Sequence, residues 1–377
     1  MGRTAARRDG SVNGRWTKYY LNRDFSGFWR RRLTKPDATV CIIGGIGFDP
    51  RSLTAIELLA GCRSTTPIDC VTLNLRPPSS QLSESYSKLE ALTDKNIGRL
   101  KSIANVNIIS EEEISLRDAE GHLVGGRNAA KILSGLFSAI TNHRDIIIDI
   151  SGLPRTIFYP LIAYLCQQSD IGKIRNLHVV VTQNSALDGC IRGGEYGNPD
   201  YLYGFRPTSS GDLKLVWLPA ISSSESSRLE KIHNQIEREC AEICPILPFP
   251  AKNLRRADEI IMQMRSILFE RMLVSENNLL LCDEQSPFDI YRKILEVDDY
   301  YKTTLSALDG LGDITTVVSP LASKMLSLGM LLAAIERKLP VSYTEAGSYQ
   351  IDGDLSVVSI EDAGSPVEIW LTGEPYE

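Results

Sequence analysis

The sequence predicts an α/β protein with two tandem Rossmann-like domains, each built on a mainly parallel sheet. Strand-like and helix-like segments alternate along most of the chain, which is typical of parallel strands joined by crossover helices. The 377 residues, 43% of them hydrophobic, exceed one ordinary domain of about 100 to 200 residues. The alternating series also occurs twice, so we expect one domain at 37–211 and a second at 212–377.

The first series has five apolar segments that predict strands, and the spacing of apolar residues by three and four predicts a helix after each of the first four. The strands are "ATVCIIGG", "IDCVTLNL", "VNIIS", "DIIIDIS" and "LHVVVTQN", and the helices lie at about 51–62, 81–103, 126–142 and 153–168. Residues 185–211 are rich in Gly, Ser, Asn, Pro and Tyr and predict a long loop or a domain connection.

The second series repeats this alternation. Its strands are "LKLVWLPAI", "CPILPFP", "NNLLLCDE", "DITTVVSP" and "LPVSYTEA", with helices at 224–243, 255–271, 287–308 and 321–337. The tail "LSVVSIEDAGSPVEIWLTGEP" predicts a C-terminal hairpin on the edge of the second sheet.

The fourth strands of the two series correspond. "DIIIDISGLPRTIFYPLIAYL" and "DITTVVSPLASKMLSLGMLLAAI" each give Asp, an apolar strand, Ser, a turn with Pro, a basic residue and a long apolar helix. An internal duplication would explain this match, and so would the periodicity that all parallel α/β domains share.

Charge is distributed unevenly along the chain. Residues 1–36 hold ten Lys or Arg against Asp9 and Asp24, whereas the whole chain has a net charge of −6. The acidic body argues against a general nucleic-acid binder. We interpret 1–36 as a basic N-terminal arm that could contact nucleic acid or a protein partner, and a solvated arm is the other interpretation.

Cysteine and hydropathy patterns predict a cytoplasmic protein. Eight scattered cysteines without a CxxC motif are typical of reduced buried thiols. Cys240 and Cys244 are one helical turn apart, but no other pair completes a metal site, so we expect no metal. No signal sequence or membrane span is evident, which predicts no membrane partner.

The loop after the first strand could bind a ligand. In "GGIGFDPR", Gly45 and Gly47 allow close approach of the backbone, Asp49 can cap the next helix, and Arg51 could contact phosphate. Pro50 replaces the third glycine of a dinucleotide fingerprint and no P-loop motif occurs, so we expect no NAD, FAD or other cofactor. The alternative is that these residues only turn the chain and cap the helix.

The ends of the fourth strands provide the other candidates. Ser151, Gly152 and Arg155 could hold an anion at a helix N-terminus, and in the second domain Ser319, Ser323 and Lys324 take the equivalent place. Helix capping explains the serines equally simply. However, a cation early in a helix is unfavourable unless an anion is near, and ligands of open sheets bind at this rim. Further polar residues on the rim are Gln183, Asn184, Asp283, Glu284, Gln285 and Glu345.

With these residues, the first domain resembles the CRISPR-associated Rossmann-fold sensor domains of prokaryotic immunity. The resemblance covers about 37–185, with an echo at 213–350, and lies in "GGIGFDPR" and "SGLPR". It implies binding of cyclic oligoadenylates by these two loops. Leu153 and Pro154 depart from the Gly/Thr turn common in that group, and no fused effector is evident, so output would come from the second domain or a partner.

Three functions follow as hypotheses. The first is a sensor of a nucleotide or other phosphorylated small ligand in a prokaryotic defence or stress response, in which binding shifts one domain against the other. The second is an enzyme acting on a nucleotide or phosphorylated sugar, with Asp49 or Glu345 as acid or base. The third is a non-catalytic subunit that docks a protein partner, and a homodimer stays open in each case.

Overall fold

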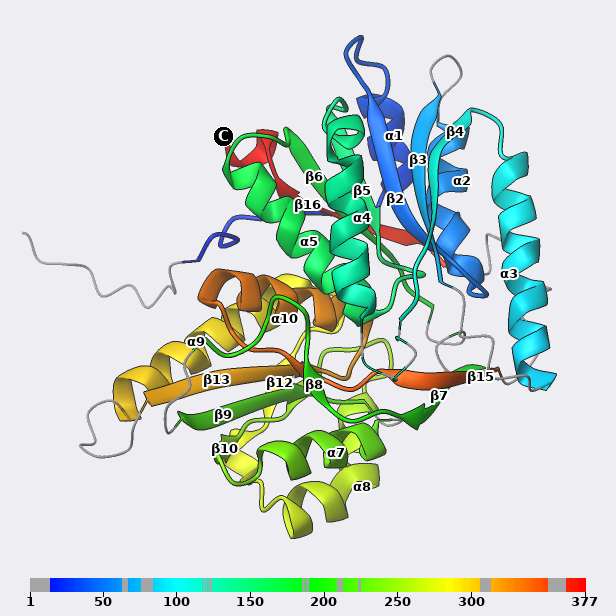
Figure 1. Ribbon diagram of the computed structural model, residues 1–377. Helices are drawn as coiled ribbons and strands as arrows, with labels where there is room; N and C mark the ends of the chain where they lie inside the picture. The colour runs from blue at the N-terminus through cyan, green and yellow to red at the C-terminus, as the bar shows by residue number, and fades with distance from the viewer. Residues whose placement is uncertain are drawn as a thin grey trace, which may run out of the picture.

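A computed structural model describes residues 14–62, 67–75, 84–116, 118, 120, 122, 124–184, 187, 190–208, 213–222, 225–305, 313–351 and 364–377. It shows two α/β lobes, one above the other in Figure 1, each with a mostly parallel sheet. The predicted fold class is therefore confirmed.

The first lobe contains a seven-stranded sheet in which five parallel strands have the doubly wound order 3-2-1-4-5. From one edge to the other the strands are β1 (Tyr20–Asn22), β16 (Pro366–Thr372), β6 (Asn176–Thr182), β5 (Asp145–Asp149), β2 (Val40–Ile46), β3 (Ile68–Asn74) and β4 (Val106–Glu113). The central strands β5 and β6 are buried throughout, which explains their continuous apolar sequence.

Helices cover both faces of this sheet. On one face α1 (Phe25–Arg32), α2 (Thr54–Gly61) and α3 (Glu84–Ser102) share a core with the strands, and on the other α4 (Gly125–Ile140) and α5 (Arg155–Asp170) do so. A short 3-10 helix, η1 (Pro50–Leu53), leads into α2.

The second lobe has a parallel sheet in which β9 (Leu213–Ala220) lies between β13 (Asp313–Pro320) and the consecutive strands β10 (Cys240–Ile243) and β11 (Ile246–Pro248). The short β12 (Leu280–Cys282) pairs with β11. The helices are α7 (Ser226–Ile236), α8 (Arg256–Arg265), η2 (Ser266–Arg271), η3 (Glu276–Asn278), α9 (Pro287–Leu305) and α10 (Lys324–Arg337). Both sheets thus share the relative order 3-2-1-4, which doubly wound sheets have in common and which does not show a duplication.

The segment expected as a loop at 185–211 contains two strands. β7 (Ile191–Tyr196) pairs with β15 (Ala346–Ile351), and β8 (Asp200–Tyr201) pairs with β14 (Ser342–Tyr343), both antiparallel. The residues of the predicted strand "LPVSYTEA" therefore lie mainly in these two-stranded ribbons, and Val341 forms one isolated bridge to β13. The sequence did not predict β7 because the strand contains two glycines, and glycine is depleted in strands.

The predicted C-terminal hairpin on the second sheet is wrong in its placement. β16 returns to the first lobe and pairs antiparallel with β6, from Pro366 opposite Thr182 to Thr372 opposite Leu177. Residues 352–363 of the predicted hairpin lie outside the described residues. Because the chain re-enters the first lobe at its end, the lobes are not strictly consecutive along the sequence.

The interpretation of 1–36 as an arm is also wrong for its described part. β1 pairs with β16, α1 packs on the sheet, and Trp16 and Trp29 are fully buried. Arg32 is buried too and forms an ion pair with Asp145. This arginine, which the sequence assigned to a basic arm, therefore stabilises the first lobe.

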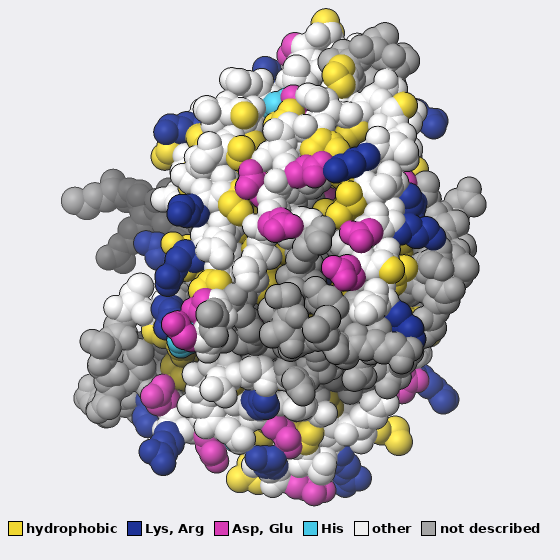
Figure 2. Space-filling view, turned by 45° about the vertical axis from the view of Figure 1, so that its right-hand side comes forward, with side chains coloured by type: hydrophobic (Ala, Val, Ile, Leu, Met, Phe, Trp, Pro, Cys, Tyr) yellow, Lys and Arg dark blue, Asp and Glu magenta, His cyan; other side chains and the backbone are white. Residues whose placement is uncertain are grey.

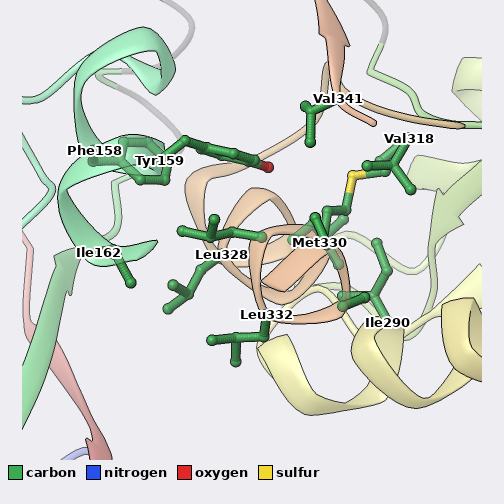
Figure 3. Close-up of a cluster of buried hydrophobic side chains, with 14 of the residues drawn as sticks. Phe158, Tyr159, Ile162, Ile290, Val318, Leu328, Met330, Leu332 and Val341 are labelled. Carbon is green, nitrogen blue, oxygen red and sulfur yellow. The ribbon is translucent and has the colours of Figure 1, made fainter. Parts of the chain in front are cut away.

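The lobes meet along α5 and α10, whose side chains pack together. Figure 3 shows Phe158, Tyr159 and Ile162 on α5 facing Leu328 and Leu332 on α10. Ten residues of α10 are buried, so this helix is apolar on all sides, as a helix between two layers must be. Among the described residues, no helix is long and apolar enough to cross a membrane.

Candidate functional site

The loop after β2 and the loop after β5 lie against each other at the carboxyl end of the first sheet, as the sequence predicts. A Cβ added at Gly45 would lie 2.6 Å from Leu153 Cδ2, and one at Gly152 would lie 2.8 Å from the Gly45 carbonyl oxygen. These two glycines are therefore required for close packing of the loops. A Cβ at Gly47 would meet nothing within 4 Å, and the Gly47 carbonyl accepts a hydrogen bond from Asn96 Nδ2 at 2.7 Å.

Asp49 and Arg51 form an ion pair within the first loop. The Asp49 carboxylate caps η1 by accepting from Arg51 N at 3.0 Å, and Arg51 Nη2 lies 2.7 Å from Asp49 Oδ2. Burial acts to raise the pKa of Asp49, but Arg51 and Lys324 outweigh it and hold that pKa below its usual value. Asp49 is thus an ionised structural carboxylate, and Arg51 is 5% exposed and already engaged.

The three predicted serines are hydrogen-bonded, and Ser151 and Ser319 are fully buried. Ser151 Oγ accepts from Thr182 N at 2.8 Å, and Ser319 Oγ accepts from Trp217 Nε1 at 2.9 Å. Ser323 is the N-cap of α10 and accepts from Leu326 N at 3.4 Å. Ser151 and Ser319 therefore fix the ends of β5 and β13 rather than cap the following helices.

The two predicted cations begin their helices and reach across the junction between the lobes. Arg155, the first residue of α5, donates from Nε to Ser327 Oγ at 2.9 Å and from Nη2 to the Ala322 carbonyl. Lys324, the first residue of α10, donates to the Ser151 carbonyl. The structure thus brings Ser151, Arg155 and Lys324 together in one reciprocal contact, which we call the cation latch.

Glu345 lies beside the cation latch but is not exposed as a rim residue. It is 1% exposed, and its carboxylate accepts from Thr156 Oγ1 at 2.8 Å and from Tyr349 OH at 3.2 Å. It therefore joins the ribbon of β7 and β15 to the N-terminus of α5.

A second arginine, which the sequence patterns did not predict, lies at this junction. Arg228 on α7 is 5% exposed, lies 3.0 Å from Glu225, and stacks over the rings of Tyr196 at 4.4 Å and Tyr343 at 5.3 Å. Burial acts to raise the pKa of Glu225, and the net pKa of this carboxyl is raised. The ion pair with Glu225 is local and common on helices, whereas the two rings that distinguish Arg228 come from β7 and β14, far away in the sequence.

The remaining rim candidates divide into two groups. Gln183 and Asn184 follow β6 directly, next to Thr182 and its bond to Ser151, so they border the same loops. In contrast, Asp283, Glu284 and Gln285 follow β12, a strand that β11 and β9 separate from β13. There Asp283 accepts from Gln285 N at 2.9 Å, Glu284 pairs with Arg256 at 3.5 Å, and the Gln285 carbonyl accepts from Arg23 of the first lobe at 3.2 Å, so this group has its own contacts apart from the cation latch.

A cleft bounded by described residues lies to the side of the cation latch, at the end of β4. This cleft has a volume of about 760 Å³ and is lined by the β4–α4 loop and the β7–β8 connection, among others by Asp118, His122, Arg127, Tyr196 and Arg206. None of the predicted site residues lines it.

One group of described residues has metal-ligand chemistry. Ligand atoms of Asp118, Glu120 and His122 lie within 4.8 Å of one another at the edge of the cleft. The Asp118 Oδ1 atom already accepts from the backbone N–H groups of Glu120 and His122, at 3.0 and 2.8 Å. The carboxylate therefore closes a turn, and this group is explained without a metal.

The described part of the face in Figure 2 shows no extended patch of basic side chains. On this part, acidic side chains gather near the middle and Lys and Arg lie mostly toward the margins. The described part of the basic segment, 14–36, is folded against the first lobe, so contact with nucleic acid through a free arm is not expected of that part.

The fold and the site define a two-lobed α/β protein whose lobes are joined, at the carboxyl end of the first sheet, by hydrogen bonds from two cations to neutral oxygens of the opposite lobe. The sequence matches no protein-family model, and no curated protein is significantly similar. Among solved structures, the chain is similar to the cytoplasmic domain of a prokaryotic cation chloride cotransporter, with 11% identity over 82% of this chain and 96% of that chain. The TM-score of 0.22 is too low to bear on fold or function.

Proposed function

We propose that this protein senses an anionic ligand, a nucleotide or another phosphorylated small molecule, at the junction of its lobes. The observation that supports the proposal is the cation latch, in which Arg155 of the first lobe and Lys324 of the second each bind the opposite lobe. Both cations are first residues of helices, where the helix dipole favours an anion.

The acceptors in the latch are neutral carbonyl and hydroxyl oxygens. An oxyanion is a stronger partner for a guanidinium or an ammonium group than such oxygens are. A ligand that engages Arg155 and Lys324 therefore competes with the contact between the lobes. Binding and lobe separation are then coupled, which is the property of a sensor.

The enzyme alternative receives less support from the residues proposed for it. Asp49 is ion-paired with Arg51 and has a lowered pKa, the opposite of what a general acid requires. Glu345 is buried and holds Thr156 and Tyr349. The resemblance of "GGIGFDPR" and "SGLPR" to immune sensor domains extends the proposal to a role in prokaryotic defence or stress response.

Isothermal titration with inorganic phosphate, mononucleotides and cyclic oligoadenylates tests this function. We expect at least one of these anions to bind the full chain, and Arg155→Ala to weaken that binding by about tenfold or more, as loss of a charge-assisted contact does. Arg175→Ala removes an exposed cation of the same lobe and should leave affinity unchanged. Absence of binding to all of these anions, or equal affinity in the Arg155 variant, would refute the proposal.

A further inference from the structure

A small cavity lies beneath the loop after β2, next to the cation latch. Its volume is about 20 Å³, and its polar wall is formed by Gly44, Gly45, Ser52, Thr72 and Asp149. A cavity of this size holds one water-sized group, provided that polar partners surround it.

Asp149 has an unused acceptor in this cavity. The residue is 1% exposed, and its Oδ1 atom accepts a hydrogen bond from Ser151 N at 2.8 Å. The Oδ2 atom is buried and has no hydrogen-bond partner in the described part of the chain. A buried carboxylate oxygen without a donor is costly, which points to a donor in the cavity of the working protein.

The cavity adjoins the place proposed for the anion. Asp149 is two residues before Ser151, whose carbonyl accepts from Lys324, and the Lys324 charge acts on both Asp149 and Asp49. A ligand whose phosphate engages Lys324 can therefore direct a neighbouring group toward Asp149.

We propose that Asp149 is a specificity-determining residue of the anion site, and that its Oδ2 atom accepts a hydrogen bond from a hydroxyl group of the ligand. The inference rests on the proposed function and restricts the ligand to phosphorylated compounds with a hydroxyl group near the phosphate, such as a sugar phosphate. In the free protein a water molecule takes the place of the hydroxyl.

Ionisation supports this role. Burial raises the pKa of Asp149 to about 6, while its bonds with Ser151 and the charge of Lys324 act in the opposite direction and Asp49 adds to the rise. The Cys70 thiol lines the same cavity, and because burial raises its pKa to about 12 it stays neutral. Near neutral pH the carboxylate is ionised and can accept a hydrogen bond from the hydroxyl group, and selectivity for the hydroxyl should fade as the pH falls through about 6.

The test compares ribose 5-phosphate with inorganic phosphate by isothermal titration near neutral pH. We expect the wild-type chain to bind ribose 5-phosphate more tightly, by about tenfold for one hydrogen bond to a charged acceptor. In Asp149→Asn this preference should disappear, while inorganic phosphate binds as well as before or better, since a negative charge has been removed. Glu90→Gln, which removes an exposed carboxyl on α3, should keep the preference.

A second variant acts on the cavity without changing the carboxylate. A Cβ at Gly44 would meet only Asp149 Cβ, at an ordinary 3.8 Å, so Gly44→Ala fills the cavity without a clash. It should remove the preference for ribose 5-phosphate as Asp149→Asn does, and melting curves confirm that each variant folds.

The outcomes separate this inference from the function on which it rests. If both phosphates bind the wild-type chain equally, or if the preference survives in a folded Asp149→Asn or Gly44→Ala variant, the role of Asp149 is refuted and anion sensing stands. If neither the phosphates nor the nucleotide panel binds, both are refuted.

Discussion

Replacing Arg32 by leucine should destabilise the first lobe by about 3 to 5 kcal/mol, the cost of removing one partner from a buried ion pair. The Arg32 and Asp145 side chains are 5% and 0% exposed, and their closest atoms are 2.6 Å apart. Arg32 also bonds Glu374 at 3.0 Å and stacks on Trp370 at 4.4 Å. Without it, Asp145 keeps a buried charge whose remaining ionisable partner is His178.

Differential scanning calorimetry measures this effect. For a lobe of this size each kcal/mol shifts the melting temperature by about 2 to 4 °C, so the expected fall is about 6 to 20 °C. Arg31→Leu is the matched control, because Arg31 is 72% exposed and lies 3.9 Å from the exposed Asp24, and its effect should stay within about 0.5 kcal/mol. Equal, small shifts in the two variants would refute the view that the basic N-terminal segment is a structural part of the lobe.

Three further predictions concern the same lobe. Burial opposes the charge of His178, but hydrogen bonds to two carboxylates outweigh it and raise its pKa. Its contribution to stability is therefore full below about pH 6.5 and lost as the pH rises through the raised pKa. Melting temperatures across this range should fall in the wild type and fall less in His178→Gln, and parallel profiles would contradict this. Gly45→Ala should cost about 1 to 3 kcal/mol through its clash with Leu153. Gly135→Ala on an exposed turn of α4 should be neutral or stabilising by up to about 1 kcal/mol, and urea denaturation compares the two. Deleting 1–36 should prevent folding of the first lobe, whereas a docking arm would be removed with the circular dichroism spectrum unchanged.

Sequence patterns predicted the parallel sheets well, because buried parallel strands are short apolar runs between helical periods. The run Ile146–Ile148 is such a case, and so is Val179–Val181 in β6. The placement of β16 was not predictable in this way. Its pairing with β6 joins residues more than 180 positions apart, and no local signal specifies the sheet to which an isolated C-terminal strand returns.

The candidate residues lie at the carboxyl end of the first sheet, as the sequence predicts, but their contacts were not predicted. The rule that ligands bind beyond the carboxyl ends of central strands selected Ser151 and Arg155 as ligand-binding residues, and that role stays a prediction. It did not reveal that Arg155 binds Ser327, because this contact joins two lobes. Asp149 was not predicted for another reason. An acidic residue at the end of an apolar strand can have many structural roles, and only the buried Oδ2 atom without a hydrogen-bond partner distinguishes this one.

The most direct test of the central claim, that the ligand and the second lobe compete for Arg155, is the anion affinity of Ser327→Ala measured by isothermal titration. Ser327 is fully buried, and its hydroxyl accepts from Arg155 Nε across the junction. Its removal weakens the latch and leaves the arginine in place. We expect tighter anion binding in Ser327→Ala and weaker binding in Arg155→Ala. Unchanged or weaker binding in a folded Ser327→Ala variant would contradict the central claim.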